Sequence, residues 1–178
     1  MYYIAVLTTE DINNQVLQWK HYMRDRFGCT VALKSPAHIT LLSPFWMNTG
    51  LQKSLEDALD AFSQQQKCFV IELHNFDSFK PRVIFVHIKE SPEFIHLAES
   101  LEKDLAANRL FPVPKPERPI HPHITIANRD LHKSDFPIAW EFFKKKKYEA
   151  SFAINCLALM KHNGATWEPA HTAMFPFL

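Results

Sequence analysis

The sequence is poor in cysteine and almost without net charge. Its three cysteines, Cys29, Cys68 and Cys156, are odd in number and far apart, so they suit neither a disulfide framework nor a Cys-x-x-Cys zinc site. We expect three reduced, mostly buried thiols in a cytoplasmic protein. The formal charge of +1, from 20 basic and 19 acidic side chains, gives no general attraction to nucleic acid or membrane. Any binding of a polyanion must therefore be local.

The sequence also lacks long apolar runs. The opening "MYYIAVLTTED" has an apolar run too short for the core of a signal peptide, and no basic segment precedes it. No later stretch approaches the ~20 apolar residues that span a bilayer. The 178 residues are 47% hydrophobic, which is enough for one well-buried core. We expect a monomer with a single two-lobed domain over residues 1–178 and no membrane contact.

Strand and helix patterns follow one another along the whole chain. Apolar or alternating stretches predict strands over residues 2–7, 30–34, 38–45, 68–79, 82–88, 123–127, 151–161 and 166–177. Apolar residues at helical spacing predict helices over residues 10–27, 51–62, 91–110 and 134–147. The proline-rich segment 111–122 predicts a rigid loop before the strand that begins at residue 123.

This order resembles one α+β unit used twice, with halves of about 1–80 and 81–178. We therefore expect an α+β fold in which two mostly antiparallel sheets face each other across a central cleft. The helices are expected to pack on the outside of these sheets.

The tripeptide His-Ile-Thr occurs twice, in "PAHITLLSPF" (36–45) and in "HPHITIANR" (121–129). A shuffled chain of this composition would contain it only about 0.03 times, which favours a true repeat. Alternate residues of a strand share a face, so His38 lies beside Thr40, and His123 lies beside Thr125. A pseudo-twofold arrangement of the halves would bring both pairs into one cleft.

Two facing histidines suit the cleavage of a phosphodiester or the opening of a cyclic phosphate. The unperturbed imidazole pKa of ~6.5 allows one ring to accept a proton while the other donates one. The nucleophile must lose a proton and the leaving alkoxide must gain one, so a base and an acid on opposite sides of phosphorus serve both needs. Thr40 and Thr125 would donate hydrogen bonds to the non-bridging oxygens.

The two motifs, with their neighbours "HITLLSPF" and "RPIHPHITIANR", resemble the 2H phosphoesterase superfamily, which includes bacterial 2′-5′ RNA ligases and 2′,3′-cyclic phosphodiesterases. The resemblance implies metal-independent cyclic phosphodiesterase chemistry, without a cofactor, carried by His38, Thr40, His123 and Thr125. The implied substrate is a nucleotide or RNA end that carries a cyclic phosphate. The physiological substrate does not carry over from the family, and neither do the separate roles of the two histidines.

Several residues outside the motifs are candidates for contact with the substrate. Arg129, Arg118 and Lys115 flank the second motif and could bind a phosphate or an RNA backbone. Phe45, Trp46 and Trp167 could stack on a nucleobase, although most aromatic rings must belong to the core.

Two other functions remain open on the sequence alone. A non-catalytic module that binds RNA or a nucleotide could use the same cleft, although a pure binder does not need both proton carriers. A metal-dependent hydrolase could use His121 and His123, but Pro122 lies between them and no third ligand follows at zinc spacing. We therefore expect no metal site.

Overall fold

The two ends of the chain come together in one sheet. The computed structural model describes residues 1–115 and 119–176. The first sheet is antiparallel, and its strand order is β2-β1-β7-β8. Its strands are β1 (Tyr2–Leu7), β2 (His38–Phe45), β7 (Cys156–His162) and β8 (Trp167–Met174).

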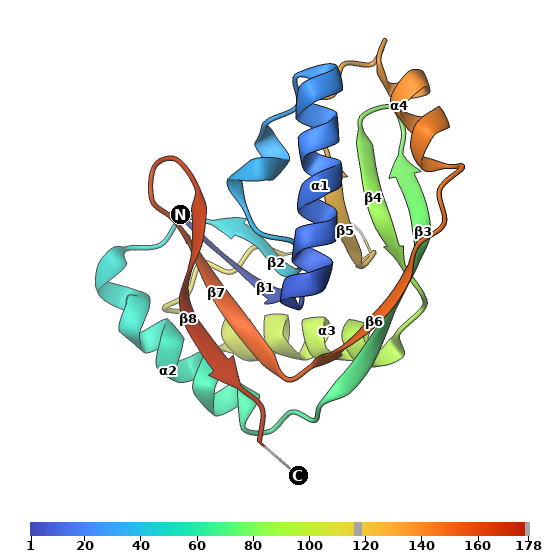
Figure 1. The fold of residues 1–178 in the computed structure, drawn as a ribbon. Helices are drawn as coiled ribbons and strands as arrows, with labels where there is room; N and C mark the ends of the chain where they lie inside the picture. Colours follow the sequence, from blue (N-terminus) through green and yellow to red (C-terminus); the bar gives the residue numbers. More distant parts are fainter. Residues whose placement is uncertain (116–118, 177–178) are drawn as a thin grey trace.

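The middle of the chain forms the second sheet, which is also antiparallel and has the order β5-β4-β3-β6. Its strands are β3 (Phe69–Phe79), β4 (Val83–Ile88), β5 (His123–Ala127) and β6 (Glu149–Ile154). The prediction of an α+β fold with two antiparallel sheets is confirmed (Figure 1). The predicted halves 1–80 and 81–178, however, do not coincide with the two sheets.

The strand expected over residues 151–161 is in fact two strands in two sheets. β6 ends at Ile154 and pairs with β3, whereas β7 begins at Cys156 and pairs with β1. Asn155 lies between them, and its carbonyl oxygen accepts a hydrogen bond from the backbone N–H of Phe175 at 2.8 Å. The chain therefore passes from one sheet to the other through a single residue.

Four helices pack against these sheets: α1 (Glu10–Phe27), α2 (Gln52–Ser63), α3 (Pro92–Ala107) and α4 (Phe136–Phe143). α1 contacts β5, α2 contacts β7 and β8, and α3 contacts β2 (Figure 1). In α1, Gly28 follows the last turn with φ of 70°, where its N–H bonds back to Arg24. None of the described helices is long and apolar enough to cross a membrane.

The stretch 30–34, expected as a strand, forms a 3₁₀ turn over Val31–Lys34. Asp130 provides the physical reason, because one of its carboxylate oxygens accepts the backbone N–H groups of Thr30 at 2.6 Å and Val31 at 2.8 Å. A donor bound in this way cannot enter a strand ladder, so a contact distant in sequence overrides the β-propensity of the segment.

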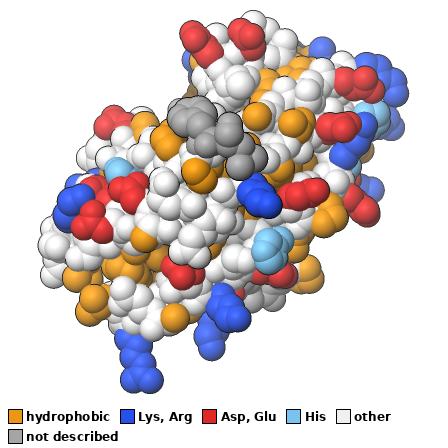
Figure 2. All heavy atoms as spheres, turned by 90° about the horizontal axis from the view of Figure 1, so that it is seen from below, with side chains coloured by type: hydrophobic (Ala, Val, Ile, Leu, Met, Phe, Trp, Pro, Cys, Tyr) orange, Lys and Arg blue, Asp and Glu red, His pale blue; other side chains and the backbone are white. Residues whose placement is uncertain are grey.

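The exposure of the thiols differs in part from the expectation. Cys29 is buried, Cys156 is half-buried, and Cys68 is exposed, so the prediction of mostly buried thiols is wrong for Cys68. Figure 2 shows one face of the molecule, on which acidic and basic side chains are interspersed. This face has no broad basic surface of the kind that would attract nucleic acid without specificity.

Candidate active site

The two His-Ile-Thr motifs lie on strands that meet between the sheets. β2 is an edge strand of the first sheet, β5 is an edge strand of the second, and the two are in contact. In both strands the isoleucine is fully buried, with an exposed fraction of 0%, whereas the histidine and threonine are half-buried. The alternation of a pleated strand thus turns each imidazole and hydroxyl away from the core.

The motifs line two adjoining hollows. The first has a volume of about 420 Å³ and is lined by His38, Thr40, Thr125 and Arg129, among others. The second has a volume of about 380 Å³ and is lined by Thr40, His121, His123 and Lys115, among others. Thr40 borders both, so the four motif residues lie along one cleft.

Both histidines are held in the same way by the backbone. His38 Nδ1 lies 2.8 Å from the carbonyl oxygen of Pro36, and His123 Nδ1 lies 2.7 Å from that of His121. Each partner is two residues earlier in the chain. Because a carbonyl oxygen can only accept, Nδ1 carries the hydrogen in both rings, and Nε2 is left with its lone pair. Nε2 is therefore the atom that can exchange a proton with a substrate.

Burial favours the neutral form of both rings. The pKa of His38 is lowered from 6.5 to about 4, mainly by desolvation. The hydrogen bond to Pro36 raises this pKa, whereas the charges of Lys20 and His123 lower it further. Desolvation also lowers the pKa of His123, and His121 adds to that effect. The effect of the His123 charge on His38 agrees with the position of the two rings along one cleft.

Aromatic side chains pack against both imidazoles. The His38 ring lies 5.0 Å from the ring of Tyr3, measured between centroids. The His123 ring lies 5.2 Å from Phe79 and 4.9 Å from Phe85. These contacts and the carbonyl bonds fix the direction of each ring before a substrate arrives.

The flanking residues predicted from the sequence are divided between the two hollows. Arg129 is exposed and lines the first hollow, while Lys115 is exposed and lines the second. Arg118 lies outside the described residues. Trp167 lines the first hollow beside Tyr3, with 4.6 Å between the ring centroids, whereas Phe45 is buried in the core. Trp46 is exposed on the surface.

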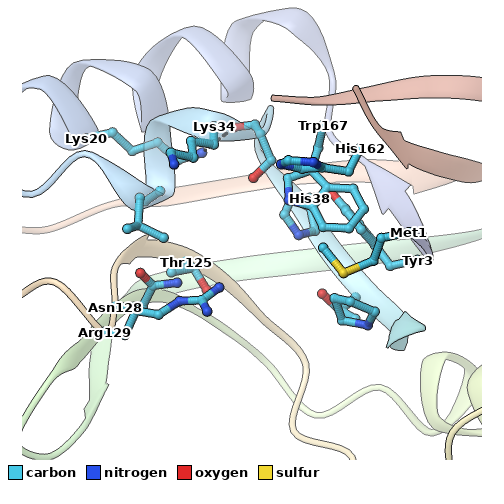
Figure 3. A pocket seen from close by; sticks show the side chains of 15 residues that line it. Met1, Tyr3, Lys20, Lys34, His38, Thr125, Asn128, Arg129, His162 and Trp167 are labelled. Atoms are coloured by element: carbon cyan, nitrogen blue, oxygen red, sulfur yellow. Dashed lines mark hydrogen bonds between the residues drawn. The ribbon is translucent and has the colours of Figure 1, made fainter. Parts of the chain in front are cut away.

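Sequence reasoning missed Lys20, Lys34 and Asn128, which also line the first hollow. Figure 3 shows Lys20 and Lys34 on the side opposite Asn128 and Arg129. The side-chain oxygen of Asn128 is buried and has no partner among the described residues. A signal for Lys20 was present in the sequence, because it lies four residues after Val16 on the buried stripe of α1.

His121 is directed into an aromatic cluster on the second sheet. Its ring lies 5.0 Å from Phe79, 6.4 Å from His87 and 6.3 Å from His123, measured between centroids. Within residues 1–115 and 119–176, no group of three or more His, Cys, Asp and Glu residues is arranged to hold a metal ion. The arrangement of the described residues gives no support to a metal centre built on His121 and His123.

A comparison with protein families found one match that covers most of the chain. A sequence model described as the 2′-5′ RNA ligase superfamily matches residues 9–166. A protein of Geobacillus thermodenitrificans, whose name suggests a phosphoesterase, is 33% identical over 115 residues. That match covers 64% of this chain and 62% of the relative, so the chain aligns with somewhat less than two thirds of the relative's length.

The fold is shared with several solved structures. Escherichia coli LigT in complex with 3′-AMP is 19% identical, with a TM-score of 0.71 over 99% of this chain and 98% of LigT. TT0787 of Thermus thermophilus is 18% identical, with a TM-score of 0.70 over 98% of this chain and 97% of TT0787. At these low sequence identities, the similarity shows a shared fold and nothing further.

Proposed function

The chain belongs to the 2′-5′ RNA ligase superfamily, the 2H phosphoesterases, and from this premise we propose that it opens a cyclic phosphate by metal-independent acid–base catalysis. The substrate is a 2′,3′-cyclic phosphate, or a related cyclic phosphodiester, on a nucleotide or on an RNA end. Ligation is the same ring opening with the 5′-hydroxyl of a second RNA end in place of water: the base takes the proton of that hydroxyl, the acid protonates the leaving 3′-oxygen, and a 2′-5′ bond is formed.

One observation carries this proposal: both histidines line the cleft and keep Nδ1 bound to a backbone carbonyl, which leaves Nε2 without a partner among the described residues. A module that only binds nucleotides needs no matched pair of proton carriers. An acid and a base held in the same tautomer on two edge strands meet the requirement of a displacement at phosphorus.

We assign the role of base to His38, because it is the deeper ring and because Lys20 disfavours its charged form. The neutral Nε2 of His38 takes a proton from the attacking water. The protonated Nε2 of His123 gives a proton to the leaving ribose oxygen in the same displacement, and proton exchange with solvent then restores both rings. No electron transfer or external reactant besides water is needed.

Thr40 and Thr125 are proposed to hold the non-bridging oxygens of the phosphate between the two rings. Each hydroxyl shares a strand face with its histidine, and both threonines line the first hollow. Donors aimed at the developing charge stabilise the transition state more than the ground state, and loss of one such donor typically costs about 10²–10³ in turnover.

A nucleotide is the proposed ligand on two grounds. The solved structures of LigT with 3′-AMP, ATP and NADP+ share the fold of this chain. In addition, Trp167 and Tyr3 form an aromatic wall on the first hollow, and such a wall suits a nucleobase.

The test is a panel of nucleoside 2′,3′-cyclic phosphates, ADP-ribose 1″,2″-cyclic phosphate and short RNAs with cyclic phosphate ends. Each is incubated with the wild type, with His123→Ala and with His96→Ala, with EDTA present throughout. His96 is an exposed histidine on α3, outside both hollows, and serves as the matched control.

We expect the wild type and His96→Ala to open at least one member of the panel in EDTA, and His123→Ala to be slower by on the order of 10²–10⁴. Activity that disappears with EDTA would contradict the metal-independent mechanism. Nucleotide binding without turnover of any member would identify a binding module instead.

A further inference from the structure

Lys20 is a buried lysine in the wall of the first hollow. Its exposed fraction is 3%, whereas lysines are almost never fully buried unless paired. It comes from the middle of α1, on the stripe that packs toward β5. An ammonium group in this position loses most of its hydration, and desolvation accordingly lowers its pKa to about 8.

Within residues 1–115 and 119–176, no acidic side chain forms an ion pair with this charge. Among the described residues, Lys20 takes part in no ion pair, and its Nζ donates one hydrogen bond, to the backbone oxygen of Ser35 at 2.9 Å. An ammonium group has three donors, so two remain for other acceptors. A buried charge without a counter-ion is costly, and an anion that enters the hollow would remove that cost.

Two further cations border the same hollow. Lys34 lies on the side of Lys20, and Arg129 lies on the opposite side, next to Asn128 (Figure 3). None of the described residues that line this hollow is Asp or Glu. The second hollow contains His123 and only one lysine, Lys115, among its described lining residues. Positive charge is therefore concentrated at one end of the cleft, on the His38 side.

This concentration exceeds the need of the reaction centre itself. The reacting phosphate of a cyclic diester carries one negative charge, and it must lie between His38 and His123. The three cations that line the hollow with His38 provide for a second anionic group, with Arg129 able to form a two-pronged contact and Lys20 a point contact.

We propose that the hollow beside Lys20, Lys34 and Arg129 binds a second phosphate group, carried by the same substrate whose cyclic phosphate reacts between the two motifs. The preferred substrate class is therefore a cyclic phosphate on a nucleotide that is phosphorylated elsewhere, or on an oligonucleotide end, rather than on an unphosphorylated nucleoside. This inference rests on the proposed function, because it places the reacting phosphate between the histidines.

The experiment measures binding, so that it does not depend on turnover. Calorimetry compares adenosine 3′,5′-bisphosphate with adenosine 3′-monophosphate for the wild type, Lys20→Met, Lys34→Met and Lys115→Met. Methionine keeps the length of the aliphatic chain and removes the charge. Lys115→Met is the matched control, because Lys115 is an exposed lysine in the other hollow of the same cleft. Thermal melts identify any variant that fails to fold.

We expect the wild type to bind the bisphosphate at least about tenfold more tightly than the monophosphate, as charge-assisted hydrogen bonds imply. Lys20→Met and Lys34→Met should lose most of that preference and bind the monophosphate as the wild type does. Lys115→Met should keep the preference. If Lys20→Met proves unstable, Lys34→Met alone tests the subsite, because Lys34 is exposed.

The proposal is overturned if the wild type shows no preference, if it binds neither ligand, or if the preference survives the loss of both lysine charges. It is also overturned if Lys115→Met removes the preference. An equal loss of affinity for both ligands in Lys20→Met would show that Lys20 contacts the reacting phosphate instead. A preference that persists without any turnover of cyclic phosphates would contradict the proposed function while leaving the second phosphate site standing.

Discussion

At the scale of single residues, the backbone determines which proton each histidine can move. The same carbonyl bond, to the residue two positions earlier, holds His38 and His123 and keeps Nδ1 protonated in both. The alternation of strand residues predicts that the imidazole and the hydroxyl share a face. It does not predict the tautomer, because that depends on the carbonyl oxygens of Pro36 and His121 lying within hydrogen-bond distance of the rings.

Burial of the two rings predicts the pH dependence of kcat/KM. As the proposed base, His38 must be neutral, so activity rises with pH through its lowered pKa of about 4. As the proposed acid, His123 must be protonated, so activity falls as pH rises through its pKa, which burial lowers from 6.5. The expected profile is a bell with its maximum on the acid side of neutrality.

This profile is measured with a nucleoside 2′,3′-cyclic phosphate, whose phosphate does not titrate in this range. A bound phosphate anion favours protonated imidazoles, so the profile of kcat should lie at higher pH than that of kcat/KM. A maximum of kcat/KM on the alkaline side of neutrality would contradict the assigned environments of the rings.

Lys20 illustrates why sequence reasoning identified only part of the candidate site. The pattern of α1 predicts a buried stripe, and a lysine on that stripe is most simply a chain whose tip reaches solvent. Which cavity its tip reaches depends on the packing of α1 against β5, and the sequence carries no mark of that packing. The repeated motif could be found from the sequence because each copy of His-Ile-Thr lies within a single strand.

At the scale of elements, one carboxylate connects the segment before β2 to the end of β5, and these two strands hold the residues of the candidate site. Asp130 follows β5 and Arg129, and it accepts the backbone N–H groups of Thr30 and Val31 across about a hundred positions of sequence. The 3₁₀ turn that begins there leads through Ser35 and Pro36 into His38. The position of the His38 segment is thus coupled to the end of β5.

We predict that Asp130→Ala lowers the free energy of unfolding by about 1–3 kcal/mol, because one carboxylate oxygen serves two backbone donors. It should also lower kcat/KM, since the segment before His38 loses its anchor. Chemical denaturation and kinetics on the same preparation measure both effects. Asp25→Ala is the control, because Asp25 is exposed and its ion pair in the described part of the chain is with the neighbouring Arg24.

A stability of Asp130→Ala equal to that of Asp25→Ala would contradict the coupling. The same pair of bonds explains why segment 30–34 was mistaken for a strand. Its residues have strand propensity, but the acceptor that captures its donors lies in the other half of the chain. No local pattern contains that information.

At the scale of the whole molecule, the two sheets do not correspond to the two halves of the sequence. The first sheet is built from both ends of the chain and the second from its middle. The sequence predicted two antiparallel sheets correctly, because strand patterns and turns are local. It placed the division near residue 80, since a repeated unit suggests that each copy folds by itself. The passage from β6 to β7 through Asn155 returns the chain to the first sheet, and only pairing over long distances determines it.

This topology predicts that the molecule unfolds as one unit. β7 and β8 complete the first sheet and β6 completes the second, so neither sheet is complete without the last third of the chain. One buried cluster also includes residues of both sheets, among them Ile39 and Ile124. We expect a single transition, with the same midpoint by tryptophan fluorescence and by far-ultraviolet circular dichroism. Two separated transitions would contradict a single cooperative domain.

The central claim is that two histidines act together as base and acid without a metal. The most direct measurement is the turnover of a cyclic phosphate substrate, in EDTA, by His38→Ala, His123→Ala and the double variant. We predict that each single substitution lowers kcat by on the order of 10²–10⁴. The kcat of the double variant should be close to that of the less active single variant, because both groups serve one step. A double variant that keeps wild-type turnover would contradict the account.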